Sequence, residues 1–246
     1  MIDVDLRGHT ALVTGSARGL GRELVLALAE CGADVVVHYR SSEEAAESLA
    51  DRVRELEDVS AMTVQADVTD PAAVDRAFDD IEDTLGQVDL LVNNVGQFSP
   101  RHWMELDVET WQTVMETNLL ATYLCCRRVL PGMFETGYGR IVNIGYAGAD
   151  RALVHPKNAP YFIAKTGVTM FTRMLAADTQ DVDINANVVA PYVIENSETF
   201  PDDLPRDRPA HFSEVVQVVL FFLAPESRYV SGQHLAVDGG WLPERV

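Results

Sequence analysis

The sequence predicts an α/β fold, in which a doubly wound parallel sheet of about seven strands carries helices on both faces. Three observations lead to this prediction. Short apolar runs alternate with longer segments of helical periodicity along the whole chain. A glycine-rich segment directly follows the first apolar run. No linker, internal repeat or low-complexity segment divides the 246 residues, so we expect a single domain over residues 1–246.

The expected strands are short apolar runs. In chain order they are Thr10–Thr14, Asp34–His38, Met62–Ala66, Asp89–Asn93, Arg140–Ile144, Ile184–Val189 and His234–Val237. Because helical segments separate them, we expect the strands to pair in parallel through crossover helices.

The expected helices fill the segments between these strands. They are Gly19–Cys31, Glu43–Glu57, Pro71–Leu85, Val108–Phe134, Pro160–Asp178 and Phe212–Leu223. Leu20, Leu24 and Leu28 recur on one face of the first helix, and Asp70-Pro71 is a typical helix start. Residues 191–211 hold several prolines and charges and are expected to form a loop.

The charge balance narrows the classes of partner. The chain holds 38 acidic and 19 basic residues, a formal net charge of −19, so we expect no nucleic acid and no membrane partner. Only Lys157 and Lys165 are lysines, which fits either a salt-adapted surface or a genome rich in arginine codons. No apolar run approaches the roughly 18 residues of a membrane span, and the first residues lack a secretory signal pattern. We therefore expect a cytoplasmic protein.

The cysteines and histidines form no metal-binding pattern. Cys31, Cys125 and Cys126 lack the spacing of metal ligands, and their odd number suits a reducing compartment. We expect them to be small buried core residues. The six histidines form no ligand pair, so we expect no metal site.

A glycine-rich segment links the first expected strand to the first expected helix. It reads Thr14-Gly15-Ser16-Ala17-Arg18-Gly19-Leu20-Gly21. Glycines let the main chain turn tightly and approach a phosphate, which then meets the free amides at the helix N-terminus. The spacing Gly-x3-Gly-x-Gly differs from the usual dinucleotide pattern, and three glycines alone also fit a simple turn.

Further motifs follow in order along the chain. They are Asp67-Val68 after the third strand, Asn93-Asn94-Val95-Gly96 at the end of the fourth, Asn118 in the long helix, Tyr161-x3-Lys165 in the next helix, and Ser231-Gly232-Gln233 with Val237-Asp238-Gly239-Gly240 near the end. Together with the glycine segment they resemble the short-chain dehydrogenase/reductase family, and within it the 3-oxoacyl-(acyl carrier protein) reductases. The resemblance covers essentially the whole chain and implies a Rossmann-like fold that binds a nicotinamide dinucleotide.

The resemblance also implies roles for particular residues. The implied cofactor contacts are Gly15, Ser16, Arg18, Gly19, Leu20, Gly21, Asp67, Val68, Asn94, Val95, Gly96, Pro191, Tyr192 and Val193. Tyr161 is the implied proton donor, Lys165 the residue that binds the nicotinamide ribose, and Asn118 the holder of a water in a proton relay. Tyr161 and Lys165 share one helix face, and an ammonium about 4 Å from the phenol would lower the pKa of Tyr161 by about 3.

The end of the second strand bears on the choice of cofactor. NAD-binding relatives carry an acidic residue there for the ribose 2′-hydroxyl, but this chain reads His38-Tyr39-Arg40-Ser41. Arg40 and Ser41, with Arg18 as a second candidate, suit a 2′-phosphate, because the arginine fork matches phosphate geometry. Ordinary surface arginines are the alternative. The sequence favours NADP(H) over NAD(H), and we expect Tyr39 to lie at the cofactor as well.

One expected catalytic residue is replaced. The family usually has Ser after the fifth strand as a hydrogen-bond donor to the substrate carbonyl, and Tyr146 stands at that place. Tyr146 replaces the Ser as donor, or it shapes the pocket while Tyr161 acts without it, or the site is crippled. Tyr146 and the residues after it also resemble enoyl-thioester reductases of the same superfamily, although the catalytic Tyr and Lys of those enzymes are separated by six residues rather than three.

Two aromatic residues and two helices bear on the pocket and the assembly. Tyr192 stands where the family usually has Gly, and it narrows the pocket, stacks near the nicotinamide or faces solvent. We expect Trp241-Leu242 to reach a neighbouring subunit, and burial within one subunit is the alternative. Family members commonly form tetramers through the helices expected at 108–134 and 160–178, which are apolar on more than one face here, so we expect a homotetramer or a homodimer.

The leading hypothesis is an NADPH-dependent reductase that converts a carbonyl, such as a 3-oxoacyl thioester, reversibly to an alcohol, with residues 191–211 on the substrate side. An enoyl or ene reductase is the alternative among enzymes. A nucleotide-binding scaffold or sensor without turnover is the alternative from another class, because the usual Ser is missing.

Overall fold

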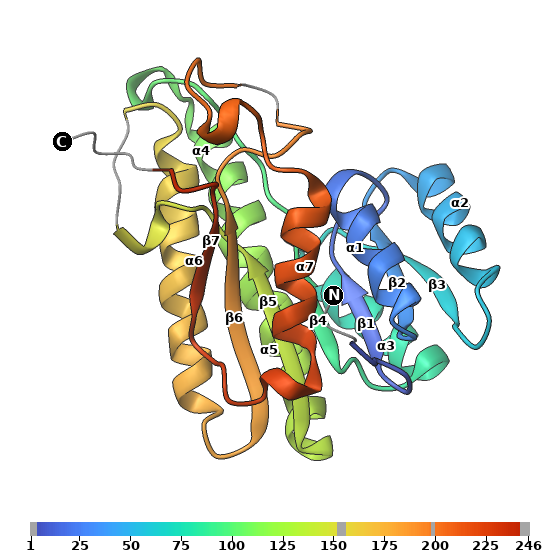
Figure 1. Ribbon diagram of the computed structural model, residues 1–246. Helices are drawn as coiled ribbons and strands as arrows, with labels where there is room; N and C mark the ends of the chain where they lie inside the picture. The colour runs from blue at the N-terminus through green and yellow to red at the C-terminus, as the bar shows by residue number, and fades with distance from the viewer. Residues whose placement is uncertain (1–3, 152–155, 198–199, 242–246) are drawn as a thin grey trace.

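A parallel sheet forms the centre of the molecule. The computed structural model describes residues 4–151, 156–197 and 200–241, and within them seven strands form one sheet. The strands are β1 (Thr10–Val13), β2 (Asp34–Tyr39), β3 (Ala61–Gln65), β4 (Leu90–Asn93), β5 (Tyr138–Ile144), β6 (Asp183–Pro191) and β7 (His234–Val237). They pair in parallel in the order β3-β2-β1-β4-β5-β6-β7 (Figure 1). The predicted doubly wound sheet is confirmed.

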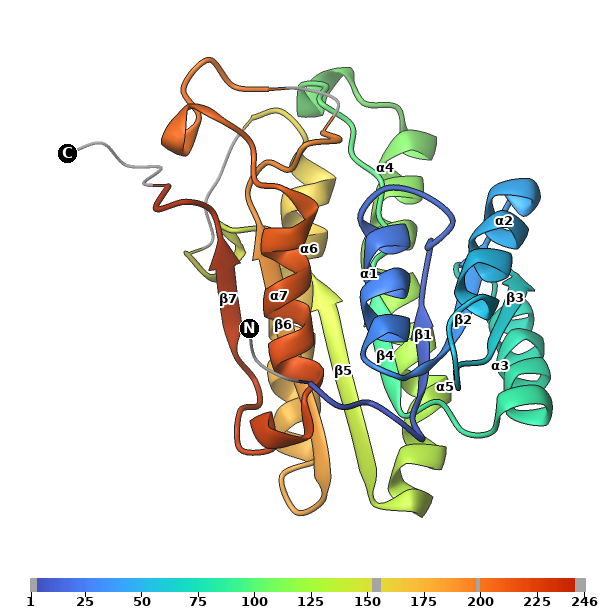
Figure 2. The ribbon, with the colours of Figure 1, turned by 45° about the vertical axis from the view of Figure 1, so that its right-hand side comes forward.

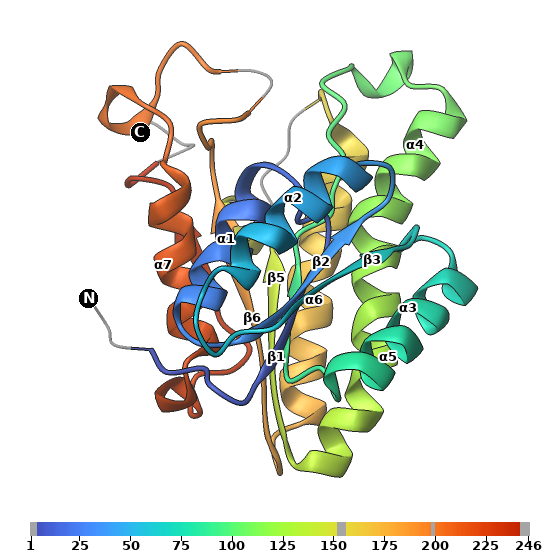
Figure 3. The ribbon, with the colours of Figure 1, turned by 90° about the vertical axis from the view of Figure 1, so that its right-hand side faces the viewer.

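Helices cover both faces of this sheet (Figures 2 and 3). In chain order they are α1 (Gly19–Glu30), α2 (Glu43–Arg54), α3 (Pro71–Leu85), α4 (Val108–Met115), α5 (Ala121–Thr136), α6 (Ala159–Asp178) and α7 (Phe212–Leu223). α1, α2 and α7 pack on one face around a core that contains Leu24 and Val219. α3, α5 and α6 pack on the other face around a core that contains Phe78 and Ile141. The predicted strands and helices therefore occur, with small shifts at their ends.

The long helix predicted at 108–134 contains a widened turn. α4 and α5 are joined by a π-helical turn at residues 116–120, so the helix is continuous but irregular in the middle. Within this turn, Asn118 Nδ2 donates to the Val114 carbonyl at 2.9 Å. π-helical turns are frequent at functional sites. Hydrophobic periodicity does not reveal the turn, because the same helix continues on both sides of it.

The loop predicted at 191–211 begins later than expected and contains a bridge and a short turn. β6 extends through Pro191, and a bridge between Ile194 and Ala210 brings the two ends of the loop together. A short 3-10 turn, Pro205–Asp207, lies between them. Residues 198 and 199 lie outside the described residues. Within the described part of the chain, no helix has the length and apolar character needed to cross a membrane.

Candidate active site

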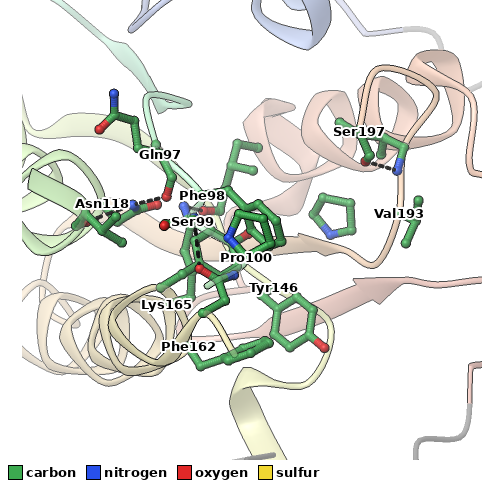
Figure 4. Close-up of a pocket in the computed structure, with 18 of the residues that line it drawn as sticks. Gln97, Phe98, Ser99, Pro100, Asn118, Tyr146, Phe162, Lys165, Val193 and Ser197 are labelled. Carbon is green, nitrogen blue, oxygen red and sulfur yellow. Dashed lines mark hydrogen bonds between the residues drawn. The ribbon is translucent and has the colours of Figure 1, made fainter. Parts of the chain in front are cut away.

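One cavity of about 1430 Å³ opens at the carboxyl ends of the central strands. Its lining comes from the segments that follow β1, β4, β5 and β6 and from the start of α6. Ligands of open α/β sheets bind at this edge, next to the point where the strand order reverses. That point is at β1, which lies between β2 and β4. Figure 4 shows side chains that follow β4, β5 and β6, such as Gln97, Tyr146 and Val193, around the cavity together with Phe162 and Lys165 of α6.

Three glycines leave the main chain of the turn between β1 and α1 without side chains. Gly15 and Gly19 have φ angles of +64° and +57°, which glycine adopts without strain. A Cβ at Gly21 would stand 2.6 Å from the Gly15 carbonyl oxygen, so the close approach of α1 to the turn requires glycine. Arg18 is the N-cap residue of α1 and lines the cavity together with Leu20. A bare main chain before a helix N-terminus fits a pyrophosphate.

His38 fixes this turn from behind, a contact that sequence reasoning missed. The Gly15 N–H donates to His38 Nδ1 at 2.8 Å, so the ring proton lies on Nε2, which is 3.1 Å from the Ala66 carbonyl. Ser16, fully buried, adds three hydrogen bonds with the His38 main chain. Burial lowers the pKa of His38 to about 4, so the ring is neutral at physiological pH. A polar residue inside the apolar run of β2 was the signal in the sequence.

Thr14 and Asn94 join the glycine turn to the end of β4. Thr14 Oγ1 accepts from the Asn94 N–H at 2.9 Å and from the Val95 N–H at 3.1 Å. Asn94 Nδ2 donates to the carbonyls of Thr14 and Gly15. Asn94 and Gly96 line the cavity. The structure thus brings together the cofactor residues predicted from the first and fourth strands.

The residues predicted for the adenosine end lie apart from this cavity. Arg40 Nη1 is 3.7 Å from Asp67 Oδ2, and both side chains are partly exposed. Burial raises the pKa of Asp67, but hydrogen bonds from a neighbouring threonine and the charge of Arg40 lower it overall. Ser41 is exposed, whereas Tyr39 and Val68 are buried. None of these five residues lines the cavity. Arg40 and Ser41 are exposed on the surface beside it, where a phosphate can reach them.

Asn118 lines the cavity and holds a buried hydrogen-bond acceptor. Its Nδ2 also donates to the Gln97 carbonyl at 2.8 Å, while its Oδ1 is buried and has no partner among the described residues. A Cβ at Gly96 would stand 2.5 Å from this Oδ1 and 3.4 Å from Lys165 Nζ. Asn118, Gly96 and Lys165 therefore lie close together. A buried acceptor without a partner is suited to a water or a ligand.

Tyr161 and Lys165 project from α6 into the same region. Lys165 Nζ lies 5.7 Å from the centre of the Tyr161 ring and donates to the Ile144 carbonyl at 2.6 Å. The predicted lowering of the tyrosine pKa is wrong for this geometry, because burial raises the pKa of Tyr161 to about 12 and lowers that of Lys165 to about 8. The prediction counted the attraction between the two groups and left out the cost of burying each charge.

Tyr146 is surrounded by other aromatic rings. Its ring centre lies 4.9 Å from that of Phe162, 6.1 Å from that of Tyr161 and 6.0 Å from that of Trp241. Figure 4 shows the hydroxyl of Tyr146 directed away from Lys165. Burial raises the pKa of Tyr146, so this hydroxyl stays protonated. The residue in the place of the usual Ser therefore presents mainly its ring to the cavity.

Tyr192 and Trp241 stack on each other at the same end of the cavity. Their ring centres are 4.0 Å apart and the rings are inclined by 14°. The contact of Trp241 with a neighbouring subunit stays a prediction, and Leu242 lies outside the described residues. Within its own chain, Trp241 packs on Tyr192 and lines the cavity with Pro191 and Val193. Spacing along the sequence could not show this contact, because the ends of β6 and β7 meet only in the folded sheet.

Asn158 is another residue that sequence reasoning missed. It is the N-cap of α6, with a φ of +62°, a conformation that Asn tolerates better than most residues. Its Oδ1 accepts from the Ser99 N–H at 3.1 Å and its N–H donates to the Arg101 carbonyl at 2.9 Å. These bonds tie the segment after β4 to the start of the helix that carries Tyr161.

The described residues contain no group of three or more His, Cys, Asp or Glu side chains that could hold a metal ion. Cys125 and Cys126 are buried, and burial raises the pKa of both thiols. Asn93 Nδ2 lies 3.3 Å from Cys126 Sγ, within the core beside β4. Neither thiol is suited to nucleophilic chemistry.

Comparisons with known proteins agree with this geometry. Residues 15–242 match a family model described as enoyl-(acyl carrier protein) reductase. The chain is 32% identical to a short-chain type dehydrogenase/reductase of Picea abies over 96% of this chain and 93% of that protein. It is 32% identical to a 3-oxoacyl-(acyl-carrier-protein) reductase of Vibrio cholerae over 96% of this chain and 98% of that protein. Its fold matches a gluconate 5-dehydrogenase from Burkholderia cenocepacia, solved with NADP and tartrate, with a TM-score of 0.88 and 34% identity over 96% of both chains.

Proposed function

Since this chain belongs to the short-chain dehydrogenase/reductase family of NAD(P)-dependent oxidoreductases, we propose that it is an NADPH-dependent carbonyl reductase. The observation that carries the proposal is the convergence of Tyr161, Lys165 and Asn118 in the cavity that also holds the glycine turn. The relative from Vibrio cholerae is a 3-oxoacyl reductase and the Burkholderia protein was solved with NADP, which supports both the reaction and the cofactor. A 3-oxoacyl thioester is therefore the first substrate to test.

The residues present fit NADP(H). The bare main chain at Gly15 and Gly21 would hold the pyrophosphate, Arg40 and Ser41 the 2′-phosphate, and Lys165 the nicotinamide ribose. When bound, NADPH supplies the hydride that reduces the carbonyl carbon. The proton and the orientation of the substrate come from side chains.

Tyr161 supplies the proton to the carbonyl oxygen. Because burial raises its pKa to about 12, the phenol is fully protonated at neutral pH and acts as the acid in the direction of reduction. Lys165, whose pKa burial lowers to about 8, is a cation below that pH and stabilises the phenolate that remains when the proton leaves. The open Oδ1 of Asn118 accepts a hydrogen bond from a water that passes a proton toward Lys165.

An enoyl reductase is the second candidate. The description of the matching family model favours it, and so does the tyrosine after β5. The separation of Tyr161 and Lys165 by three residues favours carbonyl reduction instead. For Tyr146 we propose the pocket-shaping role, because its ring contacts the Tyr161 ring and its hydroxyl is directed away from Lys165 in Figure 4.

A second copy of the chain is proposed to cover the outer side of α5 and α6. Apolar side chains there are more than a third exposed, which is typical of a surface that a partner covers. They are Leu120 of the π-helical turn before α5, Tyr123 of α5, and Ile163, Met170 and Met174 of α6. A homotetramer or homodimer would bury them, and the mass of the purified protein in light scattering tests this assembly.

The experiment that tests the function measures NADPH consumption by the purified protein at low and high salt. Acetoacetyl thioester and its matched enoyl thioester are offered in parallel. Turnover of the keto compound that Tyr161→Phe reduces by at least about 100-fold supports the proposal. Turnover of the enoyl compound alone selects the second candidate. NADPH binding without turnover of any carbonyl or enoyl compound contradicts both and favours a nucleotide-binding scaffold.

A further inference from the structure

Aromatic residues from three neighbouring strand ends meet at one end of the cavity. Tyr146 follows β5, Tyr192 follows β6 and Trp241 lies beyond β7, and Phe162 of α6 completes the group, which we call the aromatic wall. Tyr192 and Trp241 stack at 4.0 Å, Trp241 and Tyr146 meet edge to face at 6.0 Å, and Tyr146 and Phe162 are 4.9 Å apart. Two of these residues differ from the family pattern: Tyr146 replaces the usual Ser and Tyr192 the usual Gly. Neither of them takes part in the proposed transfer of the hydride and the proton.

The aromatic wall adjoins the proton donor. Tyr146 and Phe162 both contact the Tyr161 ring, with centres 6.1 Å and 5.9 Å away. On another side, Phe98 meets Tyr161 edge to face at 5.5 Å and is 42% exposed. A carbonyl at the Tyr161 hydroxyl therefore has aromatic surface around its substituents.

The rings of the aromatic wall are not fully buried. Each member is partly exposed and lines the cavity, so ring surface is available to a ligand. Figure 4 shows Tyr146 and Phe162 side by side at the edge of the cavity. Apolar and aromatic side chains that line a concave site, with a few polar groups at one point, are the usual composition of a small-molecule site.

We infer that the substrate is a ketone that carries a flat aromatic ring as one substituent, and that Trp241 and Tyr192 bind this ring. The inference rests on the proposed function and narrows its substrate class. Two aromatic rings in edge-to-face or offset geometry attract each other more strongly than the burial of the same apolar area alone explains. A hydroxylated chain in the same place would bury hydroxyl groups against ring faces, which is costly unless each finds a partner. In the reaction, the ketone, NADPH and one proton give the secondary alcohol and NADP⁺, with the hydride on the carbonyl carbon and the proton of Tyr161 on the oxygen.

A matched pair of ketones tests this inference. 4-Phenyl-2-butanone and 4-cyclohexyl-2-butanone have the same carbon skeleton and an unconjugated carbonyl, but only the first has a flat ring. We expect a kcat/KM higher for the phenyl compound by a factor of about two to ten, the gain of a ring pair. Trp241→Leu should bring the ratio close to one, and Trp241→Phe should keep most of it. Trp103→Leu, at an exposed tryptophan outside the cavity lining, should leave the ratio unchanged.

The outcomes separate the inference from the function on which it rests. Equal turnover of the two ketones, or a ratio that Trp241→Leu does not change, overturns the inference and leaves the reductase in place. Turnover of acetoacetyl thioester without turnover of either ketone also overturns the inference and leaves the proposed reductase in place. If the protein turns over neither ketone nor acetoacetyl thioester, the proposed function is overturned together with the inference. NADPH binding to Trp241→Leu, measured by cofactor fluorescence, shows whether the variant is folded.

Discussion

The two ends of the cavity are built differently. Next to β1, the wall comes from the glycine turn and the segment after β4, with Arg18, Gly21 and Asn94 among its residues, and hydrogen bonds such as that from Asn94 Nδ2 to the Gly15 carbonyl hold it. Next to β6 and β7, aromatic rings form the wall, and ring contacts such as that between Tyr192 and Trp241 hold them. A dinucleotide common to many enzymes is bound through backbone geometry, whereas one particular substrate is distinguished by side chains. The first end therefore tolerates little change, and the second is open to variation.

The largest effect is expected where the backbone itself must move. A Cβ in Gly21→Ala would stand 2.6 Å from the Gly15 carbonyl oxygen and 2.8 Å from Ser16 Cα. Both are main-chain atoms, so the turn has to shift and lose its fit to phosphate. Overpacking of this kind costs about 1–3 kcal/mol, and we expect NADPH binding to weaken by up to about 100-fold. Titration of NADPH fluorescence measures it.

Gly132→Ala is the matched control for that variant. Gly132 is also helical, but a Cβ there meets the flexible Gln87 side chain rather than main-chain atoms. We expect its NADPH affinity to equal that of the wild type. Full NADPH affinity in Gly21→Ala would mean that the glycine turn is not the phosphate site, and the contrast between the two ends of the cavity would be lost.

The same contrast explains how far the sequence could predict the site. The glycine turn and the Tyr161–Lys165 pair are local patterns, and a strand-turn-helix segment or one helix face places them correctly. The pKa of Tyr161 was mispredicted because it depends on burial, which the spacing of two residues does not contain. The contact of Trp241 with Tyr192 was not predicted, because it exists only after β7 pairs with β6.

The second prediction concerns the acid stability of the cofactor end. The pKa of His38 is lowered by burial from 6.5 to about 4, so between these values the unfolded chain binds a proton that the folded chain does not. The free energy of unfolding therefore decreases as pH falls through this window, by an amount on the order of 2 kcal/mol at pH 5. His38→Leu removes the titrating group. We expect its melting temperature to fall less between pH 7 and pH 5 than that of the wild type.

At pH 7 the same variant should be less stable than the wild type, because the Gly15 N–H loses its acceptor. An unchanged pH dependence in His38→Leu would mean that the ring is not held neutral by burial, and that the turn gains its rigidity from Thr14 and Asn94 alone.

The smallest effect on cofactor binding is expected at the exposed edge of the cofactor site, where a side chain rather than the backbone would bind the phosphate. Arg40 is 58% exposed and already faces Asp67 at 3.7 Å, so solvent and this carboxylate both weaken its attraction for a 2′-phosphate. We expect Arg40→Ala to weaken NADPH binding by about tenfold and NADH binding little, since NADH lacks the phosphate. Arg54→Ala, at a surface arginine paired with Asp51, should change neither affinity. Equal losses for both cofactors would remove Arg40 as the determinant of preference and leave Arg18, which lines the cavity, as the other candidate.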